Sequence, residues 1–125
     1  MVRRKIQIRA PKRLKPVLRR LARRVLRAEG SKKGVNIVLG DDETLADLNK
    51  RFKGREEATD VLAFDFAEED FLGEVYVSLD RARKQAAEYD VSLENEVRRL
   101  VIHGLLHLLG YSHEDMEHLM KRYLE

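Results

Sequence analysis

The sequence predicts an α+β fold in which helices cover a small mixed four-stranded sheet, mostly parallel with one antiparallel strand. Strand-like and helix-like segments alternate along the first half of the chain, and its two β-α-β crossovers predict parallel pairing of the first three strands. The link between the last two predicted strands is too short for a crossover, so that pair is expected to be antiparallel. The chain after residue 79 has mainly helical patterns.

The first strand and helix occupy the basic N-terminal part of the chain. Residues 5–9 alternate between polar and apolar side chains, which predicts a strand. Pro16 begins a helix that runs to about Ala28, and Gly30 ends it. One half of this helix is apolar and is expected to face the core. The other half is a stripe of arginines: Arg19, Arg20, Arg23, Arg24 and Arg27.

The middle of the chain supplies the remaining strands. Residues 35–39 form an apolar run typical of a buried strand, and the acids near residue 42 favour a helix from there to about Phe52. A polar loop follows. Residues 60–66 and 74–78 predict two strands, joined by an acidic loop that closes at Gly73.

Three helices complete the predicted fold. The first spans about residues 80–88. Ser92 caps the second, which reaches Leu109 and stops at Gly110. The third covers residues 114–125.

Composition limits the class of protein. The 125 residues, 43% of them hydrophobic, suit one domain, expected to span residues 1–125. Cysteine is absent, which excludes disulfides and thiolate metal sites. The sequence has no membrane span or secretory signal pattern, so we expect a soluble cytoplasmic protein with no membrane partner.

The net charge of +3 is unevenly distributed. Residues 1–33 hold 14 basic side chains and one acid, whereas the rest holds 11 basic and 21 acidic side chains. A basic end on a nearly balanced chain indicates a polyanion partner, such as a nucleic acid. A solvated arginine face without a partner is the alternative interpretation.

The segment "HGLLHLLGYSH" carries three of the four histidines. From Leu100 onward its helix is apolar on nearly all sides, so we expect His103 and His107 to be buried one above the other. Gly110 turns the chain so that His113 can return towards them. Three imidazoles with an open fourth position predict a site for one divalent metal ion, zinc first, with nickel or another ion left open. Core histidines bonded to the backbone are the alternative, and His118 is expected at the surface.

The spacing H-x-x-x-H-x-x-G-x-x-H is that of zincin proteases of the metzincin type and predicts a zincin-like metal helix. Those proteases use a glutamate after the first histidine as a general base. Here that position is Gly104, which cannot accept a proton. A peptidase of that mechanism is therefore disfavoured.

The histidine segment also resembles the signature of the YbeY family, H-G-x-L-H-L-x-G-Y-D-H. Two further blocks, "LNKRFKGREEATDVLAF" and "GEVYVSLDRARKQAAEYDVSLENEV", are similar to family blocks in the same order. The resemblance covers residues 35–125 and, loosely, the N-terminal strand and helix. It implies a single-strand-specific, metal-dependent endoribonuclease that acts in rRNA maturation, near the 16S 3′ end, and in ribosome quality control. RNA and the ribosome or its small subunit would be its partners, and His103, His107 and His113 its metal ligands.

The chain departs from the family pattern near the site. Lys53 stands where the family has an arginine thought to act at the site, and Arg55 is a candidate substitute. Ala58, Ala63 and Ser112 replace the family's proline, serine and aspartate. These changes bear on catalysis more than on the metal ligands.

Two functions of different class follow from the resemblance. In the first, an endoribonuclease holds the RNA backbone along the arginine stripe and offsets phosphoryl charge with Lys53 or Arg55. In the second, a non-catalytic ribosome- or RNA-binding assembly factor has a structural metal site. The general base and the oligomeric state stay open.

Overall fold

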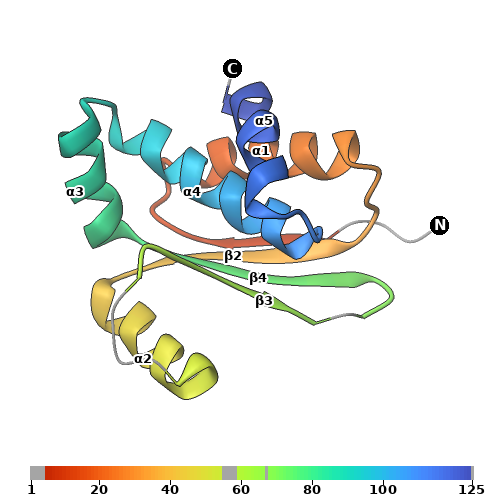
Figure 1. The fold of residues 1–125 in the computed structure, drawn as a ribbon, viewed down its shortest axis with the longest axis horizontal. Helices are drawn as coiled ribbons and strands as arrows, with labels where there is room; N and C mark the ends of the chain where they lie inside the picture. The colour runs from red at the N-terminus through yellow and green to blue at the C-terminus, as the bar shows by residue number, and fades with distance from the viewer. Residues whose placement is uncertain (1–4, 55–58, 67, 125) are drawn as a thin grey trace.

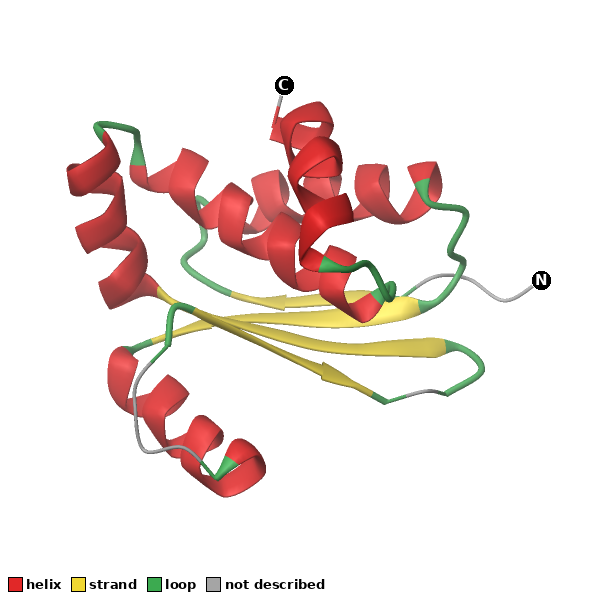
Figure 2. Ribbon diagram, in the orientation of Figure 1, coloured by secondary structure: helices red, strands yellow, loops and turns green. Residues whose placement is uncertain are grey.

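The computed structural model describes residues 5–54, 59–66 and 68–124, and its sheet has helices on both faces (Figures 1 and 2). The strands are β1 (Ile6–Arg9), β2 (Gly34–Gly40), β3 (Val61–Asp65) and β4 (Phe71–Ser78). The helices are α1 (Lys15–Ala28), α2 (Asp42–Lys53), α3 (Leu79–Tyr89), α4 (Leu93–Leu108) and α5 (His113–Leu124). The predicted α+β class and element order are confirmed. None of the described helices is long and apolar enough to cross a membrane.

The sheet has the strand order β1-β2-β4-β3, with β1, β2 and β4 parallel and β3 antiparallel to β4. One antiparallel strand in a mostly parallel sheet is as predicted. The expected parallel pairing of the first three strands is confirmed for β1 and β2 and is wrong for β3, because β4 lies beside β2 and β3 lies at the edge. Val75 and Val77 of β4 are fully buried, which suits the central position. The short hairpin link then makes β3 antiparallel.

Strand β4 begins earlier than the sequence predicts. It starts at Phe71, so Gly73 lies inside the strand and does not close the preceding loop. A Cβ atom on Gly73 would come within 2.1 Å of the Phe64 carbonyl oxygen. Glycine at this position therefore lets the two strands of the hairpin approach closely.

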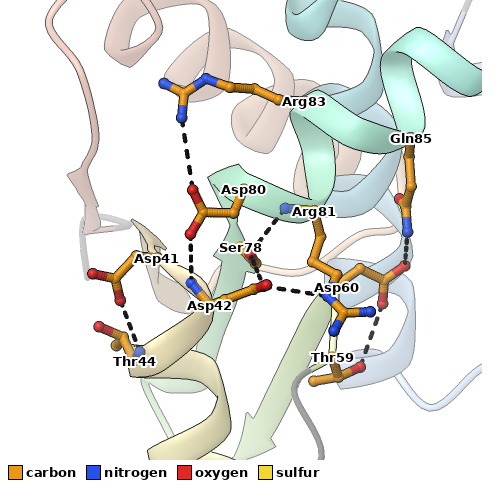
Figure 3. Close-up of polar contacts among 10 residues, drawn as sticks. All are labelled: Asp41, Asp42, Thr44, Thr59, Asp60, Ser78, Asp80, Arg81, Arg83 and Gln85. Carbon is orange, nitrogen blue, oxygen red and sulfur yellow. Dashed lines mark hydrogen bonds and ion pairs between the residues drawn. The ribbon is translucent and has the colours of Figure 1, made fainter.

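The N-termini of α2 and α3 are held together by polar side chains (Figure 3). The backbone N–H of Asp42 donates to Oδ2 of Asp80 at 2.8 Å, and the Ser78 hydroxyl donates to Oδ1 of Asp42 at 2.7 Å. Ser78 in turn accepts the backbone N–H of Arg81 at 3.1 Å, as the N-cap of α3. These bonds fix the start of α2 against the end of β4, on the face of the sheet opposite α4.

Helix α4 is the centre of the core on the other face. Its fully or almost fully buried apolar side chains are Val97, Leu100, Val101, Ile102, Leu105 and Leu106. Gly104 faces β4, where an added Cβ would lie 2.5 Å from Cγ1 of Val75. The backbone of α4 thus lies closer to the sheet than a residue with a side chain would permit.

Helix α5 is fastened to α1 by residues distant in sequence. Glu29, at the end of α1, accepts hydrogen bonds from the hydroxyls of Tyr111 and Tyr123. Arg24 donates to the carbonyl oxygens of Arg122 at 3.0 Å and Tyr123 at 3.2 Å. Burial and the bond to Glu29 raise the pKa of Tyr123 to about 12, so its hydroxyl stays a donor at neutral pH. These contacts fix both ends of α5.

The close approach of α4 to the sheet gives a stability prediction. Replacing Gly104 with Ala should destabilise the fold by about 2 kcal/mol, because overpacking of about 3 kcal/mol exceeds the gain in helix propensity of about 1 kcal/mol. Gly40→Ala is the control, since its Cβ would meet Thr44 at an ordinary 3.4 Å. Urea unfolding measures both variants. A Gly104→Ala protein as stable as the parent would contradict the overpacking account.

Candidate functional site

One pocket receives all three histidines of the "HGLLHLLGYSH" segment. It has a volume of about 360 Å³ and lies among α4, the start of α5, β3 and the end of α2. His103, His107 and His113 contribute to its wall. The other lining residues are Asn49, Lys53, Thr59, Val61, Leu62, Ala63 and Gly104.

Local structure explains how the three rings reach the same pocket. His103 and His107 lie one turn apart on α4. The chain then turns at Gly110, whose φ of 91° is a left-handed conformation that favours glycine. His113 follows as the first residue of α5, and its ring centroid lies 5.8 Å from that of His103.

The expectation that His103 and His107 are both buried is wrong. His103 is half-buried, whereas His107 and His113 are exposed. The pocket opens to solvent beside the last turn of α4, so its outer histidines can bond to water. A metal is therefore not required to satisfy them, and the case for one rests on the shared pocket. His118 is exposed on α5, as expected.

The donor set fits a divalent ion of the zinc class, although the rings stand slightly too far apart. With Zn–N bonds of about 2.0–2.1 Å and tetrahedral angles, two ligand rings would have centroids roughly 5 Å apart. The observed 5.8 Å between His103 and His113 exceeds that value by less than an ångström. Within the described ranges, no three His, Cys, Asp or Glu side chains converge closely enough to hold a metal. Binding would need the imidazoles to move closer together.

Asp60 is a site residue that the sequence motifs did not single out. Its carboxylate accepts hydrogen bonds from Thr59 at 3.4 Å and Gln85 at 3.3 Å, as Figure 3 shows. Burial lowers the pKa of His103, and the negative charge of Asp60 offsets part of that effect. His103 is therefore neutral at neutral pH, the form that binds metals. The sequence signal that could have identified Asp60 was its position in the "TDVLAF" stretch, which is part of a family block.

A fixed cation also lies on the histidine face of α4. Arg99 precedes His103 by four residues and makes two bonds, of 2.9 and 2.6 Å, to the carboxylate of Glu96. Glu96 is only 1% exposed, so its charge depends on this bidentate pair. Arg99 was not predicted as a site residue, although its spacing from His103 and His107 is visible in the sequence.

The structure places the other predicted site residues in different surroundings. Lys53, at the end of α2, lines the histidine pocket, and its Nζ lies 5.6 Å from the centroid of the Phe64 ring. Arg55, the candidate substitute, lies outside the described residues. Ser112 donates to the Asp115 carboxylate at 3.0 Å and accepts the Asp115 backbone N–H at 3.3 Å. Its side chain thus caps the start of α5.

The predicted arginine stripe divides into two groups. Arg19 donates to the Ile6 carbonyl at 2.7 Å, and Arg24 bonds to carbonyls at the end of α5, so these two hold the fold together. Arg20, Arg23 and Arg27 remain exposed on α1. We call these three residues the arginine face.

The arginine face does not adjoin the histidine pocket. Arg20 shares a shallow surface cavity with Arg98 of α4, and Arg98 lies about 140° around that helix from His103 at 100° per residue. An extended ligand on the arginine face would reach the pocket only by crossing α4.

Comparison with known proteins identifies the family. A family model described as "Endoribonuclease YbeY" matches residues 2–123. The chain belongs to the YbeY family. A solution structure of TM1509 from Thermotoga maritima is similar to this chain with a TM-score of 0.73 and 33% identity, covering 96% of this chain and 87% of that one. The resemblance inferred from the histidine signature is thus confirmed.

Curated relatives named YbeY match parts of the chain at about 40–44% sequence identity. "Endoribonuclease YbeY" of Aquifex aeolicus is 44% identical over 84 residues, covering 64% of this chain and 56% of the relative. The protein of that name from Endomicrobium trichonymphae is 40% identical over 106 residues, covering 84% of this chain and 75% of the relative. The match to Nautilia profundicola covers 60% of that relative, so this chain spans less than two thirds of some relatives.

The shared pocket predicts metal binding that depends on its histidines. The protein should bind about one Zn²⁺ per chain, and His107→Ala should weaken binding by about 100-fold or more, since even outer-shell partners contribute about 10- to 100-fold. His118→Ala, which changes an exposed histidine outside the pocket, is the matched control. Elemental analysis and competition with a chromophoric chelator measure both. Equal affinities of the two variants would contradict a metal site at His107.

Proposed function

We propose that this chain is a single-strand-specific, metal-dependent endoribonuclease. Its role would be in rRNA maturation, near the 16S 3′ end, and in ribosome quality control in the cytoplasm. RNA and the small ribosomal subunit are its proposed partners, and residues 1–125 its metallohydrolase domain. The observation that carries the proposal is that three histidines and Lys53 line one pocket in a chain of the YbeY family.

The proposed ligands of one divalent ion, zinc first, are His103, His107 and His113. Such an ion, when bound, supplies Lewis acidity toward phosphoryl oxygens. The negative charge of Asp60 acts on His103, and its carboxylate is held by Gln85. We assign Asp60 the role of an anion that acts on His103 through its charge.

Lys53 is the proposed residue for charge stabilisation at the phosphoryl group. It lines the same pocket as the histidines, from the end of α2. An ammonium in a partly enclosed pocket offsets negative charge that develops on a phosphodiester during cleavage. A lysine acts here as a point charge and lacks the bidentate fork of the family's arginine. Arg55 keeps its proposed role as a substitute cation.

An assembly factor that binds RNA without cutting it is the second candidate. The arginine face favours it, because the three exposed guanidiniums can hold phosphates at a distance from the histidine pocket. In the endoribonuclease proposal the same face binds a flanking part of the substrate. Both candidate functions therefore include RNA binding by the arginine face, and only the endoribonuclease cleaves the RNA.

Cleavage of a labelled single-stranded RNA tests the primary proposal. Wild type and His118→Ala should cleave it at equal rates, chelation should abolish cleavage, and His107→Ala should be inactive. A duplex of the same sequence should resist. Equal cleavage by wild type and His107→Ala would assign the activity to a contaminant. Salt-sensitive binding with no turnover by any variant would favour the assembly factor.

The same assay tests Lys53 against a neighbour on its own helix. Lys53→Ala should lower kcat by about 10- to 100-fold, with a small effect on KM, because the lost charge acts mainly on the transition state. Lys50→Ala removes an exposed charge that does not line the histidine pocket and should leave kcat unchanged. Loss of activity in both variants would point to a general charge effect.

The arginine face should contribute to RNA affinity through phosphate contacts. Replacing Arg20, Arg23 and Arg27 together with Gln should reduce the slope of log K against log salt by about 2, since each phosphate contact adds about 0.7 for single strands. Lys84→Gln, which removes one exposed charge on α3, is the single-charge control. Fluorescence anisotropy at several salt concentrations measures the slopes. An unchanged slope in the triple variant would leave the face as solvated surface.

A further inference from the structure

Three aromatic rings form a row on the face of the sheet opposite α4. The ring centroids of Phe52 and Phe64 lie 5.4 Å apart, and those of Phe64 and Tyr76 lie 5.8 Å apart. Leu62 pairs with Tyr76 and Phe64 pairs with Glu74, so Phe64 lies diagonally opposite Tyr76 on the neighbouring strand. Side chains alternate along a strand, so Val75 packs against α4 while Tyr76 points to the other face.

Phe52 is the accessible end of this row. Its side chain is 63% exposed at the end of α2, the most exposed large hydrophobic of the described residues. Its ring packs edge-on against Phe64 at an interplanar angle of 63°. Phe52 therefore presents a large aromatic surface to solvent while its neighbour supports one edge.

Cations flank the two rings. Nζ of Lys53 lies 5.6 Å from the Phe64 centroid, and the guanidinium of Arg51 lies 5.8 Å from the Phe52 centroid. Arg51 also lines a groove of about 830 Å³ on this face of the sheet, together with Arg9, Lys15 and Tyr76. The groove is lined by four basic side chains, Arg9, Lys15, Arg19 and Arg51, and by two acids, Asp47 and Glu74, so its lining has a net positive charge. The surface around the rings thus suits an anionic ligand with flat, apolar parts.

The aromatic row is continuous with the histidine pocket through Lys53. This side chain lines the pocket and also lies over the ring of Phe64. Strand β3, which carries Phe64, is the edge strand of the sheet. Because Lys53 belongs to both surfaces, a flexible chain bound in the pocket can contact Lys53 and then its neighbour Phe52.

We propose that Phe52, supported by Phe64, is a stacking subsite for an unpaired nucleobase of the RNA held in the histidine pocket. The proposal rests on the proposed function. Every base offers a flat face to an aromatic ring, whereas a base in a duplex is already stacked on its neighbours. Arg51 then binds a phosphate next to that base, while Lys53 keeps its proposed place at the phosphoryl group in the pocket. The subsite gives the chain a means of selecting single strands without reading sequence.

A tryptophan reporter tests this subsite directly, because the chain has no tryptophan of its own. In Phe52→Trp, single-stranded RNA should quench the indole emission in a saturable way as a base stacks on it. Phe66→Trp is the matched control, since Phe66 is 44% exposed and packs on Phe71 at 5.2 Å, outside the row. Its emission should not change. Stopped-flow mixing reads both signals before turnover.

An abasic oligonucleotide separates stacking from charge. Phe52→Ala should weaken binding of single-stranded RNA by about tenfold, as expected for the loss of one contact between a base and an aromatic ring. The same variant should bind an oligonucleotide with abasic sites as well as wild type does. Circular dichroism and thermal unfolding confirm that the Ala and Trp variants fold. An equal loss on both ligands would overturn the stacking role.

The outcomes distinguish this proposal from the proposed function. Quenching of the indole in Phe52→Trp, together with no cleavage by wild type, supports the subsite and contradicts the endoribonuclease. Cleavage of RNA by Phe52→Trp with unchanged indole emission overturns the subsite alone. A change in that emission with protein concentration, in the absence of RNA, would assign Phe52 to contact with a second copy of the chain and also overturn the subsite.

Discussion

The contact between Gly104 of α4 and Val75 of β4 is the constraint on which the rest of the site depends. Because no Cβ separates them, α4 lies against the sheet along its C-terminal half. Rotating the helix to fit a side chain there would move His103 and His107 away from β3. A glutamate at position 104, as in zincin proteases, would point into Val75. The missing general base and the position of the histidines therefore have one structural cause.

Much of the fold could be predicted because its signals are local. Pro16, Ser92, Gly30 and Gly110 mark helix ends through caps and backbone conformations that depend on a few neighbouring residues. Strand order could not be predicted this way, because the insertion of β4 beside β2 depends on contacts between distant segments. The prediction that His107 is buried was wrong for a similar reason. An apolar helix is buried only where other elements cover it, and the sequence does not show which part is covered.

The candidate site shows the same division between local and distant information. The three histidines belong to one short segment, so their meeting in a pocket followed from helix periodicity and a glycine turn. Lys53 reaches that pocket because the hydrogen bonds of Asp42 with Asp80 and Ser78 fix the start of α2 against the sheet. Asp60 and Arg99 were missed because the role of a charged residue depends on the side chain that it faces, which the sequence does not show. The predicted arginine stripe also included Arg19 and Arg24, although each bonds to backbone carbonyls.

The attachment of α5 to α1 has a consequence for how the site forms. His113 is held in place by Glu29 and Arg24 through contacts that span 82 to 99 residues of the chain. These long-range contacts dock α5 against α1, whereas the local turn at Gly110 brings His113 back towards His103. A ligand that requires His113 binds only when α5 is docked, and it shifts the local opening equilibrium of α5 toward the closed state. Occupancy of the pocket is thereby coupled to hydrogen exchange in a helix most of which lies outside it.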